Sequence, residues 1–299
     1  MAVEITEEFV WQNIPRRPRD SHKGTFGSVL AVAGSAFYRG AALLAAEGAL
    51  RTGAGIVTLA SVEPVVSAAA ARLPECCLCP CRAGAEGGIS PENVPLLRRQ
   101  KATVLLLGPG LGGTAQSAAR AAETQALVQQ LLPGFAGSAV LDADALNALA
   151  AGKYRGDLPA NTILTPHPGE AARLLALTVP EVQADREGAA VSLAEKYHCV
   201  AVLKGHHTLV AAPDGTVWRN ETGNAGLAKG GSGDILAGLT AGLLAAGLKQ
   251  GRTPEDAAVC AIWLHGAAAD RCAKRRSMTA MLPGDLFEDL GWILGELGR

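Results

Sequence analysis

The stretch from Asn224 to Leu248 joins a glycine-rich turn to an apolar run, and Asp234 lies at the junction. The turn reads AKGGSGD, and every residue from Ile235 to Leu248 is apolar, Thr, Ala or Gly, which predicts a helix. A glycine turn that leads into a helix offers free backbone N–H groups and the positive end of the helix dipole to an anion such as phosphate. Asp234 could be no more than a carboxylate in the first helical turn that interacts favourably with the helix dipole. Beside a bound phosphate, however, its carboxylate can accept the proton of an attacking hydroxyl group. We therefore expect phosphate on the N–H groups and Asp234 facing the same cavity.

Other polar residues follow short β-rich runs. His167 lies between two prolines in TPHPGE, which fixes its position for a ligand, although a lone histidine is more often structural. Glu170 opens an Ala-rich helix, so it is either an ordinary helix-start carboxylate or, beside phosphates, a residue that helps to hold Mg²⁺ through waters. Lys204 is either a solvated charge or a cation that attracts nucleotide phosphate. The histidine pair in KGHHT is not spaced as metal ligands, and the P-loop pattern G-x-x-x-x-G-K-[ST] is absent, so kinase-like chemistry needs another fold.

These motifs need elements that bring them together, and the chain supplies strand-like runs that alternate with Ala-rich helical runs. Buried strands are predicted at residues 27–34, 55–60, 103–108, 139–142, 163–164 and 200–204, and a hairpin at 209–212 and 216–219. Helices are predicted at residues 41–52, 171–176 and 235–248, with a leading helix or arm within 1–22 and a helical tail over 260–299 that breaks near 278–284. The alternation predicts an α/β fold, a mainly parallel central sheet with helices on both faces.

Each motif follows the carboxyl end of a predicted strand, so motifs far apart in the sequence should meet at one edge of the sheet. The motifs are GSAFYRGA, GPGLG, LDADALN, TPHPGE, KGHHT and AGLAKGGSGD. The first of these turns offers only Gly34 and Gly40, so it does not meet the Rossmann fingerprint G-x-G-x-x-G. Six such turns in order indicate a ligand site at that edge.

Composition excludes several other classes of protein. The 299 residues are 48% hydrophobic and carry a net charge of −1, with no linker or repeat, which predicts one domain over residues 1–299 and argues against a nucleic-acid partner. The longest apolar run, Ile235–Leu248, is too short to span a membrane, and the acidic N-terminus lacks the apolar core of a signal peptide. We therefore expect a cytoplasmic protein with no membrane partner.

Four of the seven cysteines cluster in PECCLCPC, at Cys76, Cys77, Cys79 and Cys81. A metal site is one hypothesis, but the spacing is not the C-x-x-C pair of zinc sites. The alternation of Cys77, Cys79 and Cys81 instead predicts one face of a strand that holds small buried thiols.

The chain resembles the ADP- or ATP-dependent NAD(P)H-hydrate dehydratases of the ribokinase-like superfamily in the order of its motifs, KGTFGSVLAVAGS, GPGLG, LDADALN, LTPHPGEAARLL, VLKGHHTLV and NAGLAKGGSGDILAGLTAGLLAAG. The resemblance runs from Lys23 to Leu286 and implies a ribokinase-like fold. GSGD alone is shared with other ribokinase-like kinases, but the combination is specific. Bifunctional members also carry an N-terminal epimerase domain, and the 22 residues before the first motif lead us to expect none here.

The resemblance implies a repair reaction on NADH or NADPH that has been hydrated at C6 of the nicotinamide ring. Transfer of phosphate to the hydroxyl group turns it into a good leaving group, and the ring nitrogen then expels phosphate and restores the dihydronicotinamide. The phosphoryl donor is ADP or ATP, accompanied by Mg²⁺. GGSGD resembles the bacterial and archaeal branch, which tends to use ADP, so ADP is the expected donor.

The resemblance also assigns site residues. Asp234 is the base acting on the hydroxyl group, and the N–H groups around Gly231, Ser232 and Gly233 stabilise charge on the transferred phosphoryl group. Substrate contacts carry over to Ala41, Gly110, His167 and Asp234. Nucleotide contacts carry over to Lys204, Gly205, His206, His207, Thr208 and Gly233. A metal role carries over to Glu170.

One departure from the wider superfamily favours a dehydratase over a kinase. Ribokinase-like small-molecule kinases often carry N-x-x-E after T-P, with the glutamate serving magnesium, whereas this chain reads HPGE from His167 to Glu170, as the dehydratases do. The magnesium role of Glu170 is therefore left open. Two alternatives are a small-molecule hydroxyl kinase of the same superfamily and a nucleotide-binding regulator without turnover, against which Asp234 argues. The wider family often assembles as homo-oligomers, commonly tetramers.

Overall fold

The computed structural model describes residues 2–152, 154 and 157–297. Within them, ten strands form one sheet in the order β1-β10-β9-β8-β7-β6-β5-β2-β3-β4. All neighbours from β8 through to β4 are parallel, β9 is antiparallel to both β8 and β10, and β1 is parallel to β10. The strands are β1 (Val3–Glu4), β2 (Ser28–Val32), β3 (Ile56–Val62), β4 (Cys77–Cys81), β5 (Val104–Leu107), β6 (Ser138–Leu141), β7 (Ile163–Leu164), β8 (Val200–Leu203), β9 (Leu209–Ala211) and β10 (Val217–Arg219).

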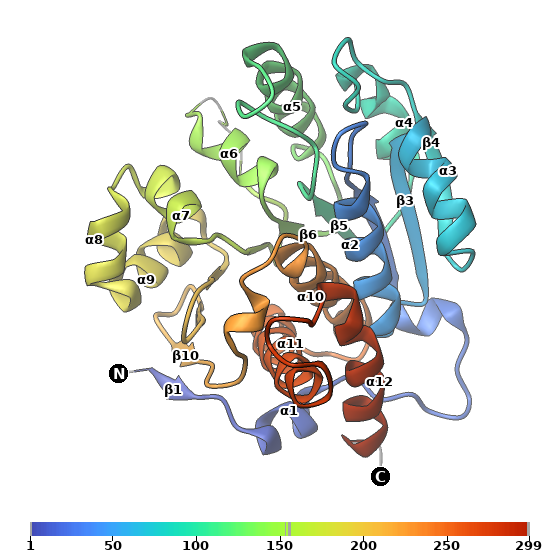
Figure 1. Ribbon diagram of the computed structural model, residues 1–299. Coiled ribbons are helices and arrows are strands. Elements are labelled where there is room, and N and C mark those ends of the chain that lie inside the picture. Colours follow the sequence, from blue (N-terminus) through green and yellow to red (C-terminus); the bar gives the residue numbers. More distant parts are fainter. Residues whose placement is uncertain (1, 153, 155–156, 298–299) are drawn as a thin grey trace.

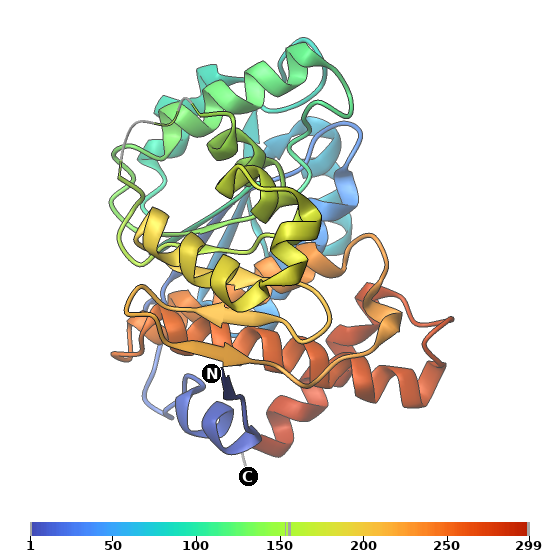
Figure 2. The same cartoon turned by 90° about the vertical axis from the view of Figure 1, so that its left-hand side faces the viewer.

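Helices cover both faces of this sheet. They are α1 (Glu7–Asn13), α2 (Arg39–Arg51), α3 (Glu63–Arg72), α4 (Val94–Arg99), α5 (Ala118–Leu131), α6 (Asp144–Ala150), α7 (Pro168–Leu175), α8 (Val179–Ala184), α9 (Arg186–Tyr197), α10 (Ser232–Leu248), α11 (Pro254–Arg276) and α12 (Leu286–Leu297). Both α9 and α11 pack on β8 and β9, and Figures 1 and 2 show the run from α5 to α9 on one side and α10 with α11 on the other. None of the described helices is both long and apolar enough to cross a membrane.

The apolar helix α10 is buried from Ile235 to Gly247, between the sheet, α2 and α11. It approaches α2 closely because small residues line the contact. A Cβ added to Gly238 would lie 2.2 Å from the carbonyl oxygen of Ala45, and one added to Gly242 would lie 2.4 Å from that of Ala49. Larger residues would push the helices apart, so the Gly- and Ala-rich composition serves this crossing.

The expected alternation of strands and helices is confirmed, including the hairpin of β9 and β10. Two boundaries differ in a useful way, since α2 begins at Arg39 and α10 begins at Ser232, each earlier than predicted. The N-terminal segment contains the predicted helix, α1, but also β1, which the sequence did not indicate because two residues are too few for a periodic pattern.

The cysteine-rich stretch forms β4, at the edge of the sheet beside β3, as its alternation predicted. Cys79 and Cys81 are buried, and burial raises the pKa of Cys81 to about 12. Cys77 is exposed, because it begins an edge strand, so the prediction of a buried thiol is wrong for that residue. All seven cysteines are free.

The strand order reverses between β2 and β5, since β3 and β4 lie on one side of β2 while β5 to β8 follow on the other. Ligands of open α/β sheets bind outside the carboxyl ends of the strands at such a switch point, at a place that we call the crevice. The loop that leads from β2 to α2 and the GPGLGG loop after β5 border it.

Candidate active site

The start of α10 is a glycine turn without a side-chain cap. Its N-cap residue, Gly231, has a φ of +103°, and no side chain caps the first turn. A side chain at Gly231 would be strained by that φ, and its Cβ would lie 2.8 Å from Leu44. The backbone N–H of Ser232 donates to the carbonyl oxygen of Lys229 at 3.3 Å, so that group is already engaged. The binding of phosphate by the N–H groups around Gly231, Ser232 and Gly233 stays a prediction, as does their catalytic role.

A lysine reaches the same turn from the end of β8. The ammonium group of Lys204 lies 3.5 Å from the place that a Cβ on Gly233 would take. Its Nζ donates to Oδ1 of Asp142 at 2.6 Å, and this buried carboxylate also accepts from Oγ1 of Thr165 at 2.8 Å. Burial acts to lower the pKa of Lys204, but Asp142 and Glu170 outweigh burial and the net direction is upward. Lys204 is therefore a positioned cation beside the helix start.

Asp234 lies in the first turn of α10, close to the same charges. Its pKa rises to about 7, first because burial disfavours the carboxylate and then because Asp142 adds a negative charge. Lys204 opposes the rise, and Asp144 adds a smaller contribution to it. A carboxyl group with a pKa near neutrality can take up and release a proton under ordinary conditions, which suits a general base.

His167 and Glu170 cap the start of α7 and each other. Nδ1 of His167 accepts from the backbone N–H of Gly169 at 3.0 Å, so the proton of the neutral imidazole sits on Nε2, 3.4 Å from Oε1 of Glu170. Oε2 of Glu170 accepts from the backbone N–H of His167 at 2.8 Å. Burial lowers the pKa of His167 and raises that of Glu170 to about 7. Glu170 is thus a helix-capping carboxylate, whatever its part in metal binding.

A cavity of about 890 Å³ opens beside the α10 start. It is lined by every residue predicted to bind nucleotide, namely Lys204, Gly205, His206, His207, Thr208 and Gly233, and also by Ser232 and His167. The structure therefore brings the predicted nucleotide set together. His167, which the resemblance assigned to the substrate, lies at the border of this cavity.

Sequence reasoning missed the opposite wall of the cavity, which comes from residues 220–225 and from Ile262, His265 and Gly266 of α11. Oγ of Ser232 and Nε2 of His265 are buried there, without a hydrogen-bond partner among the described residues. Burial lowers the pKa of His265 to about 4, so its imidazole is neutral. Unpartnered buried polar atoms beside a cavity favour a polar ligand such as a nucleotide. The only sequence signal was the polar, glycine-containing run NETGNAG before the turn.

The other predicted substrate contacts meet at the switch point. A Cβ on Gly110 would lie 2.8 Å from the Cβ of Ala41, so the loop after β5 lies directly against the start of α2. The backbone N–H of Gly34 donates to the carbonyl oxygen of Pro109 at 2.8 Å and ties the two loops together. Ala41 and Gly110 do not line the nucleotide cavity. Asp234 does not line that cavity either, whereas His167 does, so the assignment of one side to the nucleotide and the other to the substrate stays a prediction.

Two aspartates after β6 turn out to organise the site. Asp142 holds Lys204, and Oδ2 of Asp144 accepts from the backbone N–H of Gly112 in the GPGLGG loop at 2.8 Å. The signal in the sequence was their place directly after a buried strand, but their partners could not be read from it.

The carboxylates of Asp142, Asp144 and Glu170 are therefore already engaged with protein groups. In the part of the chain that the structure describes, no group of three or more His, Cys, Asp or Glu is arranged to hold a metal ion. A magnesium ion would be held chiefly by nucleotide phosphates and waters, with Glu170 reaching it through water. The residues present fit an ion that arrives with the nucleotide better than a permanently bound one.

Comparisons with known proteins show what this chain is similar to. A family model described as NAD(P)H-hydrate dehydratase matches residues 29–291. The chain is 41% identical over 288 residues to the ADP-dependent (S)-NAD(P)H-hydrate dehydratase of Neisseria meningitidis. This alignment covers 95% of this chain and 90% of that protein. It spans only 54% and 48% of the length of two bifunctional NAD(P)H-hydrate repair enzymes that it also matches.

Solved structures show the same architecture. The ADP/ATP-dependent NAD(P)H-hydrate dehydratase of Bacillus subtilis, co-crystallised with ATP and Mg²⁺, is 34% identical and superimposes with a TM-score of 0.82 over 99% of both chains. A ribokinase-like superfamily protein from Enterococcus faecalis is 27% identical, with a TM-score of 0.83 over 99% of this chain and 96% of that one. The ribokinase-like fold that the sequence predicted is confirmed.

Proposed function

The chain belongs to the NAD(P)H-hydrate dehydratase family, and on that premise we propose that it returns C6-hydrated NADH or NADPH to NAD(P)H, with ADP, or alternatively ATP, as the phosphoryl donor. One observation carries the proposal. Asp234, with its pKa raised to about 7, lies in the first turn of a helix whose uncapped start also meets Lys204. The Neisseria relative is named as ADP-dependent and the Bacillus relative as ADP/ATP-dependent, which supports the donor.

Phosphoryl transfer is the first step of the proposed reaction. Asp234 accepts the proton of the C6 hydroxyl group while that oxygen bonds to the terminal phosphorus of the nucleotide. The bond from this phosphorus to its bridging oxygen breaks, and AMP leaves when the donor is ADP. The N–H groups of the Gly231–Gly233 turn and the ammonium group of Lys204 stabilise the charge on the transferred group.

Elimination is the second step. The C6–O bond breaks as the lone pair of the ring nitrogen moves towards C6, orthophosphate leaves, and loss of a proton from C5 gives the dihydronicotinamide. The N–H groups that donate to the transferred phosphoryl group also stabilise the departing phosphate. The sum converts hydrate and ADP into NAD(P)H, AMP and orthophosphate.

The proposal includes Mg²⁺, an assembly state and a location. Mg²⁺ would neutralise charge on the nucleotide phosphates, and the ATP and Mg²⁺ used with the Bacillus relative support its presence. We treat residues 1–299 as one domain and propose a cytoplasmic homo-oligomer, specifically a tetramer.

A product balance tests the proposed reaction. Purified protein with hydrated NADH, ADP and Mg²⁺ should give equal amounts of NADH, AMP and orthophosphate, measured by anion-exchange chromatography and phosphorus NMR. A phosphorylated product that persists without NADH would instead support the small-molecule kinase. Binding of ADP with no turnover of any hydroxyl substrate would support a nucleotide-binding regulator.

A further inference from the structure

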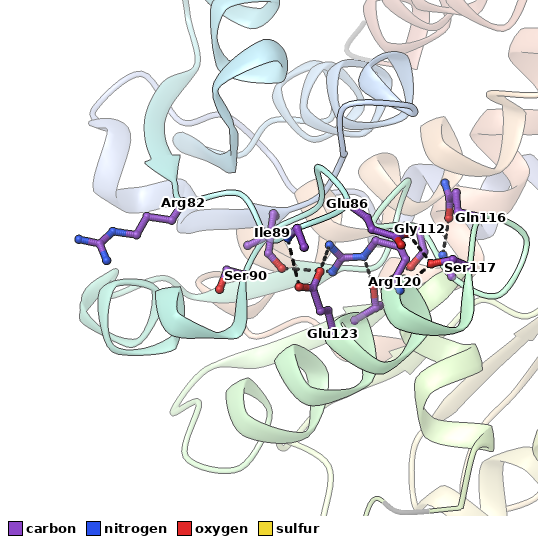
Figure 3. A network of polar contacts seen from close by, with 12 residues as sticks. Arg82, Glu86, Ile89, Ser90, Gly112, Gln116, Ser117, Arg120 and Glu123 are labelled. Atoms are coloured by element: carbon purple, nitrogen blue, oxygen red, sulfur yellow. Dashed lines mark hydrogen bonds and ion pairs between the residues drawn. The ribbon is translucent and has the colours of Figure 1, made fainter.

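A fully buried arginine lies behind the loops at the switch point. Arg120, on α5, is 1% exposed, and its guanidinium group spreads over three partners (Figure 3). Nη1 donates to Oε2 of Glu123 at 2.8 Å, Nη2 donates to the carbonyl oxygen of Ile89 at 3.2 Å, and Nε donates to Oγ1 of Thr124 at 3.2 Å. These partners belong to two segments, α5 itself and the chain that follows β4.

From Arg120 the contacts continue into the loop after β5. Thr124, which accepts from the guanidinium group, donates its own hydroxyl proton to the carbonyl oxygen of Gly112 at 2.6 Å. The N–H of Gly112 is held on the other side by Asp144. Both backbone groups of Gly112 are therefore fixed by side chains, two residues after the Gly110 that contacts Ala41.

A second set of contacts runs through residues 84–89, which we call the 84–89 loop. The backbone N–H of Ala85 donates to Oε1 of Glu123 at 3.4 Å, and Ser117, whose Oγ accepts from the N–H of Arg120 at 3.0 Å, donates to the carboxylate of Glu86. The carbonyl oxygen of Gly87 in turn accepts from the N–H of Ala36 at 2.8 Å. The 84–89 loop thus connects Arg120 to the loop after β2.

A buried charge needs a reason, because an apolar side chain of similar volume commonly stabilises a fold as well or better. What an apolar side chain lacks is a planar fork of five N–H donors that fixes several acceptors at once. Here the fork fixes acceptors that lead to both loops of the crevice, where a ligand is expected to bind.

We propose that Arg120 is a positioning residue for the hydrated dinucleotide: it holds the loops after β2 and β5 in the places from which Ala41 and Gly110 contact the substrate. This inference rests on the proposed function, since it assigns the crevice to the substrate and the 890 Å³ cavity to the nucleotide. Arg120 acts through the loops and touches neither the reacting atoms nor Lys204.

Kinetics separate this role from a general structural one. Arg120→Met should raise the KM for the hydrate about tenfold or more, because small displacements of binding groups are costly, while the KM for ADP changes less than about twofold. Arg120→Lys keeps the charge without the fork and should not restore the wild-type KM. Thr124→Val removes only the link to Gly112 at nearly constant volume and should reproduce part of the defect.

Two further variants serve as a substitute for Arg120→Met and as a control. If Arg120→Met fails to fold, Gly88→Ala replaces it, since the added Cβ would lie 2.0 Å from Nη1 of Arg120 and displace the guanidinium group. Arg98→Met is the control, because Arg98 also donates to backbone carbonyls, those of Gln130 in α5 and of Pro133 just after it, but at the end of the helix far from the crevice. Its KM values should equal those of the wild type.

Hydrogen–deuterium exchange tests the inference without relying on turnover. In Arg120→Met or Gly88→Ala, amides of residues 84–89 and 108–113 should exchange faster, while those at the start of α10 keep their protection. An unchanged KM for the hydrate, an equal loss of both ligands, or faster exchange spread evenly over the chain would each overturn the inference. If the wild type itself shows no nucleotide-dependent recovery of NADH, the proposed function fails, and the exchange pattern alone decides whether Arg120 positions these loops.

Discussion

Replacing Asp234 by asparagine should separate activity from stability. The side chain keeps its shape but can no longer accept a proton, so kcat should fall by roughly two to four orders of magnitude, the usual contribution of a general base. Binding of ADP should stay near normal, because the cavity residues and the N–H groups of α10 are unchanged.

The same substitution should raise stability at neutral and higher pH. In the folded protein the pKa of Asp234 is about 7, against an ordinary value of 3.8. The stability that this raised pKa contributes is complete below the ordinary value and is lost as the pH rises through about 7. A pKa that is raised by one in the folded state corresponds to about 1.4 kcal/mol of the free energy of unfolding. The rise from 3.8 to about 7 therefore limits the loss of stability to roughly 4 kcal/mol. Because the carboxylate is partly exposed and lies near Lys204, we expect about 1–2 kcal/mol.

Unfolding in denaturant measures the difference in stability, turnover assays measure kcat, and calorimetry measures the binding of ADP. The Asn variant should be more stable than the wild type at about pH 8, with a smaller difference at about pH 5, where the wild-type carboxyl group is protonated in the fold. Asp214→Asn, at an exposed turn, is the control. The N–H of Thr216 lowers the pKa of Asp214, so this carboxyl group is ionised at both pH values, and the substitution should change neither kcat nor the difference in stability between about pH 5 and about pH 8. An unchanged kcat would remove Asp234 from the mechanism. A variant less stable than the wild type at the higher pH would refute the argument from charge burial.

Three further predictions follow from the geometry. Below neutrality kcat/KM should fall about tenfold per pH unit, because the base must be deprotonated and the pKa of Asp234 is about 7; a pH profile flat through that region would contradict this. Lys204→Met should weaken ADP binding in calorimetry by about tenfold or more, and it should lower the melting temperature because buried Asp142 loses its charged partner. Lys196→Met is the control, since this lysine also donates a hydrogen bond within the fold, and it should leave ADP binding unchanged. Gly110→Ala should raise the KM for the hydrate and spare ADP, because its φ of +65° and the 2.8 Å approach to Ala41 leave no room for a methyl group; equal KM values for wild type and variant would argue against a substrate contact there.

The sequence was sufficient where local pattern carried the information. The turn at Gly231–Gly233 and the helix after it are contiguous, so both could be predicted as local structure. The pattern of strands also placed KGHHT correctly, directly after the carboxyl end of β8. The pairing of Lys204 with Asp142 could not be predicted, since the residues are 62 positions apart and meet only through the register of β6, β7 and β8.

Arg120 shows a second limit of sequence reasoning. In an Ala-rich helix with glutamate three residues on, it resembles an ordinary surface arginine, and only the packing of the 84–89 loop buries it. Cys77 shows the opposite case, a residue that was predicted to be buried and is exposed. Alternation predicts which residues share a face of a strand, but not how far that face is covered at the edge of a sheet.

The most direct test of the central claim is the near-ultraviolet absorbance of dihydronicotinamide during incubation of the purified protein with hydrated NADH and Mg²⁺. The account predicts a rise in absorbance that requires nucleotide, is faster with ADP than with ATP, and disappears in Asp234→Asn. A flat trace with both nucleotides, from protein that binds ADP, would contradict the dehydratase assignment and favour a kinase that acts on another hydroxyl substrate.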